Sequence, residues 1–180
     1  MKTEDRRSPA RGLLSPLVSS IKERNKEEDR DTLIRLLEVV LEQLAFVFTE
    51  EAEKEELIVQ DGNYIHVAMS YTGTGSHSHK GHIEIAMPIE MSFLVAANIL
   101  GIDDQEMIKK SADDAARELL NIYCGQVLTT LFSTDEIFDL MIPEVTPFGA
   151  DEWNVMVDNP DTIGVKIEEF PFLMLLSIRN

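Results

Sequence analysis

The chain has 180 residues, of which 44% are apolar, so it is long enough for one domain with a sizeable core and an additional arm. Its formal net charge of −17 argues against nucleic-acid binding, which depends on lysine and arginine, and against anionic membrane surfaces. No apolar run reaches the roughly 18 residues of a membrane span. The single cysteine, Cys124, precludes an intramolecular disulfide and predicts a cytoplasmic protein in which this thiol is a small buried hydrophobe.

The first 30 residues are predicted to form a flexible N-terminal arm. They are rich in charge, and Pro9, Gly12 and Pro16 interrupt any long helix. A short amphipathic helix is expected at 17–25, where it could dock on a partner.

A folded domain is expected over residues 31–180. Its first predicted element is an amphipathic helix over 31–48, with Asp31 as the N-cap and apolar side chains at helical spacing. The next is a β-hairpin over 57–73, because Asp61-Gly62 favours a tight turn between a β-branched run and an alternating one.

A loop rich in glycine and histidine is predicted over 72–82. It contains three of the four histidines, His77, His79 and His82, so metal binding has to be considered. Imidazoles two or three residues apart, with no cysteine or acid among them, are weak evidence for a metal site, and none is predicted. A metal-dependent role for this loop stays open as an alternative.

The second half of the chain is predicted to begin with a strand over 81–88 and a buried helix over 89–100 that is ended by a glycine. A long helix follows over about 104–132, capped by Asp103 or Asp104. The remaining apolar runs are expected to be strands, at 137–149, 153–158, 162–170 and 172–178. Because strands and helices occur in blocks, the predicted class is α+β, with a largely antiparallel sheet packed against long helices.

The long helix carries one polar stripe. Asp114, Glu118, Asn121 and Gly125 recur at i, i+4, i+7 and i+11, which places them within roughly 60° of one another on a helix. The opposite side is apolar, with Ala116, Leu119, Leu120, Tyr123 and Val127. From spacing alone, a solvated helix face is the better interpretation of this stripe than a site.

The stretch around the stripe resembles the chemotaxis phosphatase family of CheC, CheX and FliY. The helix motif of that family has an Asp or Ser, a Glu four residues later, an Asn three residues after the Glu, and a Pro further on. The chain matches it with Asp114, Glu118, Asn121 and Pro143. The preceding GHIEIAMPIEMSFLVAANILG, residues 81–101, is similar to the family's strand, proline and helix ending in glycine. The resemblance therefore implies a CheC-like fold.

A single motif helix points to the CheX-like branch of this family. CheC-like members carry two such helices, whereas the first predicted helix of this chain has neither a Glu-x-x-Asn pattern nor any asparagine. The resemblance thus implies one site, and it also implies that two copies form a homodimer through their sheets.

The resemblance implies a protein phosphatase that acts on a phosphorylated CheY-type response regulator. The substrate would be an acyl phosphate on a receiver aspartate, with Mg²⁺ bound by the receiver and no cofactor bound by this chain. Asn121 would orient the attacking water and Glu118 would pair with the receiver's active-site lysine, so these two are the expected catalytic residues. Asp114, Gly125 and Pro143 are expected to contact the partner.

A non-catalytic interaction module is the main alternative. Relatives of this fold also serve as structural parts of the flagellar switch, so the chain could dock a response regulator without hydrolysing its phosphate.

Overall fold

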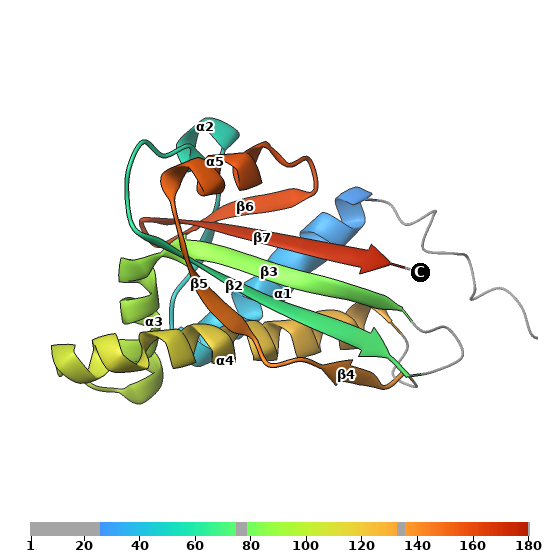
Figure 1. Ribbon diagram of the computed structural model, residues 1–180, viewed down its shortest axis with the longest axis horizontal. Coiled ribbons are helices and arrows are strands. Elements are labelled where there is room, and N and C mark those ends of the chain that lie inside the picture. Colours follow the sequence, from blue (N-terminus) through green and yellow to red (C-terminus); the bar gives the residue numbers. More distant parts are fainter. Residues whose placement is uncertain (1–25, 75–78, 133–135, 180) are drawn as a thin grey trace, which may run out of the picture.

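In the computed structural model, the described residues, 26–74, 79–132 and 136–179, form seven strands and five helices (Figure 1). The strands are β1 (Thr49–Glu51), β2 (Tyr64–Gly73), β3 (Lys80–Pro88), β4 (Phe138–Leu140), β5 (Glu144–Phe148), β6 (Thr162–Ile167) and β7 (Phe170–Arg179). The helices are α1 (Lys26–Ala45), α2 (Lys54–Leu57), α3 (Ile89–Leu100), α4 (Gln105–Leu131) and α5 (Ala150–Asp158). The helix predicted at 17–25 and most of the predicted arm lie outside the described residues.

All seven strands belong to one sheet, and every pairing in it is antiparallel. The order is β1-β6-β7-β3-β2-β4, and β5 also pairs with β2. The two short strands β4 and β5 share the outer edge of β2, where β4 pairs with residues 71–73 and β5 with residues 64–68. The predicted α+β class with an antiparallel sheet is confirmed.

Helices α1, α3 and α4 cover one face of the sheet and enclose the main core (Figure 1). Successive residues of β2 and β3 alternate between this face and the other one, as expected for strands, and those on this face are apolar. Fully buried side chains come from both layers, and they include Leu37, Leu41, Val95, Leu119, Val67 and Ile85. Each such aliphatic side chain stabilises the fold by about 1.5–3 kcal/mol.

Helices α2 and α5 cover one end of the opposite face, around Trp153 (Figure 1). The indole of Trp153 is fully buried, its Nε1 donates to the carbonyl of Leu57 at 2.7 Å, and its ring lies 4.6 Å from that of Tyr64. A second, smaller core thus forms between these two helices and strands β2, β3 and β7.

The helices predicted in the middle of the chain are confirmed. Helix α3 ends at Gly101, whose φ of 62° is left-handed and therefore suits glycine. Helix α4 begins after Asp104, whose carboxylate accepts from the backbone N–H groups of Glu106 and Met107 at 3.0 and 3.2 Å. Of the two predicted N-caps, Asp104 is thus the one used.

The predicted hairpin over 57–73 is wrong, because only its second half is a strand. Leu57 ends α2 and is buried in the smaller core. The side chain of Asn154 accepts from the backbone N–H of Val59 at 3.1 Å and donates to its carbonyl at 2.8 Å. Because a side chain satisfies these backbone groups, this segment needs no partner strand.

The strand predicted over 153–158 is also wrong, because these residues belong to α5. Trp153, Met156 and Val157 are buried at i, i+3 and i+4, which is helical spacing. The carboxylate of Glu152 accepts from the N–H of Gly149 at 2.7 Å and so closes the first turn.

Two predicted boundaries also change. Asp31 is not an N-cap, because residues 26–30 are already helical and extend α1 into the predicted arm. The strand predicted over 137–149 is divided into β4 and β5 by a bulge. The residues opposite Ala68 and Tyr71 are Glu144 and Leu140, so the edge segment has one residue more than β2 at this point.

Candidate active site

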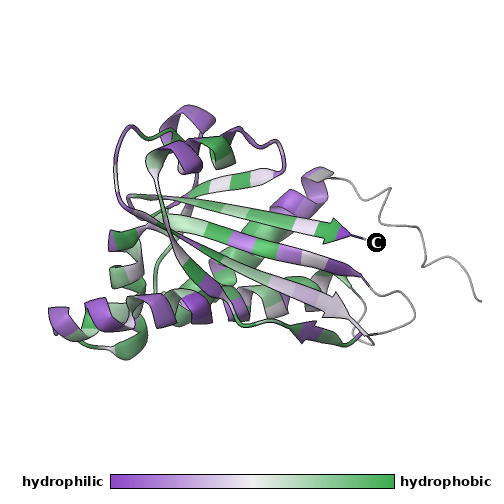
Figure 2. Ribbon diagram, viewed as in Figure 1, coloured by the Kyte–Doolittle hydropathy of each residue, from purple (hydrophilic) through white to green (hydrophobic). Residues whose placement is uncertain are grey.

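The polar stripe lies on the solvent side of α4. Asp114, Glu118 and Asn121 are exposed and Gly125 is half-buried. The five apolar residues predicted on the opposite side, Ala116, Leu119, Leu120, Tyr123 and Val127, have no exposed surface. The predicted division of the helix into a polar and an apolar side is therefore confirmed. Figure 2 shows hydrophilic and hydrophobic residues alternating along α4.

Tyr123 fixes the rotation of α4 about its axis. Its hydroxyl donates to the carbonyl of Leu33 in α1 at 3.0 Å and lies 2.9 Å from the sulfur of Met174 in β7. Burial raises the pKa of this phenol, so the hydroxyl keeps the proton that it donates. Since the ring is anchored between α1 and the sheet, the stripe is held facing outward.

Cys124 is next to the stripe but takes no part in it. The side chain is fully buried, and burial raises the pKa of the thiol to about 12. A thiol that stays protonated and out of contact with solvent is not a nucleophile. The predicted role as a small buried hydrophobe is confirmed.

The polar side chains of the stripe differ in whether they have a hydrogen-bond or ion-pair partner. Arg117 forms an ion pair with Asp114 at 2.8 Å, one turn along the helix. The side chains of Glu118 and Asn121, by contrast, make no hydrogen bond or ion pair with any described residue. Arg117 was missed from the sequence, although its i, i+3 spacing from Asp114 signals this pairing. The carboxylate of Glu118 and the carboxamide of Asn121 are thus available to a partner.

Gly125 is not required by the packing of this chain. A β-carbon built on it would meet no atom within 4 Å. A glycine in a helix interior costs about 1 kcal/mol relative to alanine, and here no described neighbour explains that cost. A bare backbone at this position allows another molecule to approach the helix closely.

Pro143 lies on the edge segment beside the stripe. It is half-buried and directly precedes β5, which contacts α4. The bulge leaves the two preceding apolar residues exposed, Met141 by 65% and Ile142 by 83%. The structure thus brings Asp114, Glu118, Asn121 and Gly125 together on one face and places Pro143 directly before β5. The apolar Met141 and Ile142 were missed, although the run before the proline contains them.

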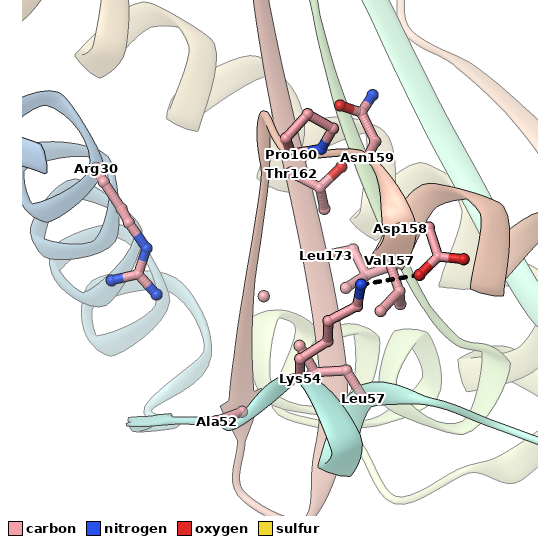
Figure 3. Close-up of a pocket in the computed structure, with 11 residues that line it drawn as sticks. Arg30, Ala52, Lys54, Leu57, Val157, Asp158, Asn159, Pro160, Thr162 and Leu173 are labelled. Carbon is pink, nitrogen blue, oxygen red and sulfur yellow. Dashed lines mark ion pairs between the residues drawn. The ribbon is translucent and has the colours of Figure 1, made fainter. Parts of the chain in front are cut away.

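Four hollows of the surface contain no stripe residue, although Asp113, the neighbour of Asp114, lines a hollow beside β5. One, of about 370 Å³, lies between α1, α2 and α5, where Arg30 and Lys54 face it and Lys54 pairs with Asp158 at 2.9 Å (Figure 3). None of the stripe residues lines it. A helix face with protruding polar groups is suited to enter the site of another protein rather than to enclose a small ligand.

The histidines form two separate groups. His82 and His66 each place Nε2 2.9 Å from a different oxygen of Glu84, whereas His79 is 3.9 Å from Glu136. His77 lies outside the described residues. Within the described part of the chain, no three His, Cys, Asp or Glu side chains are arranged to hold a metal ion.

A family model described as "Chemotaxis phosphatase CheX" matches residues 67–148. The match includes all of α4, the four stripe residues and Pro143. This part of the chain is similar to the CheX family. The resemblance inferred from the motif is thereby confirmed, including its CheX-like branch.

Solved CheX structures have the same fold. Chemotaxis protein CheX from Desulfovibrio desulfuricans superposes with a TM-score of 0.60 at 18% identity, over 84% of this chain and 99% of that one. CheX from Vibrio vulnificus gives 0.59 at 14% identity, over 84% and 99%. The CheX-CheY-BeF3-Mg²⁺ complex from Borrelia burgdorferi gives 0.56 at 21% identity, over 87% and 99%.

Two negative findings complete the description of the chain. At the level of sequence, no curated protein matches it significantly. Among the described residues, none of the helices is both long enough and apolar enough to cross a membrane.

Proposed function

We propose that this protein dephosphorylates a CheY-type response regulator, and that Asn121 orients the water that attacks the acyl phosphate. One observation carries the proposal: the Asn121 carboxamide and the Glu118 carboxylate lie one turn apart on a rigid, outward-facing helix, without a partner among the described residues. The match of residues 67–148 to the CheX family model supports it, and so does the similarity of the fold to CheX in the Borrelia burgdorferi complex of CheX with CheY.

The chemistry requires little from this chain. Hydrolysis of an acyl phosphate needs a water held in line with the bond that breaks, and it needs neutralisation of the phosphoryl oxygens. The receiver supplies its own Mg²⁺ and lysine for the neutralisation, so no cofactor of this chain takes part. A carboxamide both donates and accepts hydrogen bonds without carrying a charge, so Asn121 can hold the missing water as a glutamine does in GTPases.

The other residues of the site set the position of Asn121. Glu118 pairs with the receiver's lysine and fixes the register of the helix against the receiver. Asp114, already paired with Arg117, presents a compact polar group at one end of the contact. Gly125 lets the receiver's backbone approach, and Pro143 extends the contact onto the edge segment.

The expected acceleration of phosphate hydrolysis can be bounded. Positioning a water without new covalent chemistry supplies about 2–4 kcal/mol, which is roughly 30- to 1,000-fold over the receiver's own hydrolysis. We also propose that the reaction takes place in the cytoplasm and that two copies of the chain pair, as the resemblance implies.

Asn121→Asp distinguishes this phosphatase from a docking module. The substitution keeps the size of the side chain but removes its donor and adds a charge next to the phosphoryl group. The measurement is loss of phosphate from a phosphorylated CheY-type receiver, together with the affinity of the same proteins. We expect acceleration by the wild type and none by Asn121→Asp. If Asn121→Asp accelerates the reaction as the wild type does, Asn121 does not orient the water; if neither protein does so while both bind, the stripe is a docking surface.

A further inference from the structure

Two phenylalanines between α1 and β1 are exposed to solvent. Phe46 is 74% exposed and Phe48 is 65% exposed, although they come within three residues of Ala45, the buried last residue of α1. Phe46 also has a φ of 53°, a left-handed conformation that is rare for a bulky side chain. Strained, exposed aromatic residues persist when the surrounding structure holds them, and they are concentrated at binding surfaces.

Hydrogen bonds hold this segment in its unusual shape. The side chain of Asn98 donates to the carbonyl of Ala45 at 2.6 Å, just before Phe46. On the other side, the N–H of Phe48 donates to the carboxylate of Glu168 at 3.1 Å, and the N–H of Glu168 donates to the carbonyl of Phe48 at 3.1 Å. Val47, between the two phenylalanines, is buried. The aromatic rings are therefore presented outward by a braced loop.

Phe46 forms one wall of a surface hollow. The hollow measures about 700 Å³, which is within the roughly 300–1,000 Å³ of pockets that take up ligands. Its lining consists of Phe46, Val47, Leu94, Asn98, Glu168, Glu169 and Phe170. None of these lining residues is basic, and the two glutamates form an acidic rim around apolar walls. The matching occupant has apolar side chains flanked by positive charge.

One segment of this chain has that chemistry. Residues 1–25 carry six basic and three acidic side chains, a net charge of +3. The whole chain has a net charge of −17, so the remainder carries −20. The same segment contains GLLSPLV, residues 12–18, with arginines before it and Lys22 and Arg24 after it. It combines apolar and basic residues as the hollow requires.

We propose that the segment around Leu13, Leu14 and Leu17 binds in cis to the hollow beside Phe46. The chain is long enough for this contact. Helix α1 spans about 29 Å from Lys26 to Ala45 at 1.5 Å per residue. Leu14 and Leu17 precede Lys26 by 12 and 9 residues, so an extended chain can carry them about 30–43 Å. Both residues can reach the far end of α1, where Phe46 lies, only if the chain between them and Lys26 is almost fully extended. The proposed contact therefore replaces the short helix that the sequence predicts at 17–25.

The full chain allows a direct test by paramagnetic relaxation. Ser15→Cys introduces a thiol next to the apolar residues, and a nitroxide can be attached to it selectively because Cys124 is fully buried. The proposal predicts loss of amide signals at residues 46–48, at Leu94 and at Phe170. It also predicts recovery of these signals at 1 M NaCl, where the Debye length falls to about 3 Å.

Two substitutions test the contact itself. Phe46→Ser removes the exposed ring and Glu169→Lys reverses a rim charge, and each should restore the lost signals. Val155→Ser is the matched control, because Val155 is 72% exposed but lies on α5, away from the hollow. It should leave the signal loss unchanged.

Three results would overturn the proposal. The first is an absence of signal loss at the hollow in the labelled full chain. The second is signal loss that persists in both Phe46→Ser and Glu169→Lys. The third comes from a mixture of isotope-labelled protein without a nitroxide and unlabelled protein that carries the nitroxide. Signal loss in this mixture would show that the segment binds a second copy rather than its own chain.

Discussion

At the scale of single residues, the site depends on side chains that the fold leaves unused. Asn121 and Glu118 have no partner among the described residues, whereas nearby polar groups such as Asp114, Arg117 and Thr129 are engaged within α4. In the proposed mechanism, the water-orienting amide need not be buried or charged, because the receiver supplies the cations. The proposed catalytic arrangement is completed only when the two proteins meet.

Gly125→Ala separates the stability of the chain from its function. Because a β-carbon at this position would meet nothing within 4 Å, the substitution should raise the free energy of unfolding by up to about 1 kcal/mol. If a receiver packs against this backbone, the same substitution should weaken both receiver binding and dephosphorylation. Denaturant unfolding and a receiver-binding titration measure the two effects. An alanine variant that binds and acts like the wild type would show that the partner does not approach here.

At the scale of elements, the orientation of α4 is set by contacts on its buried side. Tyr123 joins this helix to α1 and to β7, and the other buried residues of α4 hold the same side against the core. The site is thus positioned by the core rather than by interactions among its own residues.

Tyr123→Phe should destabilise the fold without changing the exposed surface. The substitution leaves the carbonyl of Leu33 without this donor in a buried position, which costs about 1–3 kcal/mol. Thermal or denaturant unfolding measures the loss, and the rate of receiver dephosphorylation below the transition should stay near that of the wild type. An unchanged stability would mean that another group, such as a water, replaces the hydroxyl.

The elements that the sequence predicts well are those with strong local signals. Helices α3 and α4 and strand β3 have clear periodicity, and a glycine or an aspartate marks a helix end. The errors around 57–63 and 150–158 have one common cause. Leu57 and Trp153, 96 residues apart, are hydrogen-bonded and buried together, and no local pattern reveals such a contact. Tertiary packing there overrides the Asp61-Gly62 turn signal and the apolar run around Trp153.

The site was predictable in part. The spacing of Asp114, Glu118 and Asn121 gives one helix face, and only the resemblance to a family turns that face into a site. The pairing of Arg117 and the exposure of Ile142 were not predicted. The i, i+3 spacing of Asp114 and Arg117 is a signal for the first, whereas the second results from a bulge whose position depends on the register against β2.

At the scale of the whole molecule, a carboxylate paired with histidines on the sheet contributes to the stability of the fold at acid pH. Glu84 in β3 is hydrogen-bonded to His66, and it lies close to His82 as well. The hydrogen bond from His66, together with the charges of both imidazoles, lowers the pKa of Glu84 below its ordinary value of 4.5. A carboxylate with a lowered pKa stabilises the fold above its ordinary pKa, and this contribution is lost as the pH falls through the lowered value.

Glu84→Gln should therefore make the free energy of unfolding less dependent on pH in the acid range. Between pH 5 and pH 3, the free energy of unfolding should fall less steeply for the variant than for the wild type, as measured by urea unfolding. Glu144→Gln, which replaces an exposed acid of β5, is the control and should follow the wild type. Parallel profiles for wild type and Glu84→Gln would show that the His66 contact does not contribute.

The measurement that tests the central claim most directly compares Asn121→Ala with the wild type on a phosphorylated CheY-type receiver. Asn63→Ala serves as the matched control, because Asn63 is also exposed and lies outside the stripe. We expect the wild type and Asn63→Ala to accelerate the loss of acyl phosphate. Asn121→Ala should bind the receiver with similar affinity and leave its phosphate lifetime unchanged. Full acceleration by Asn121→Ala would contradict the claim that this carboxamide orients the attacking water.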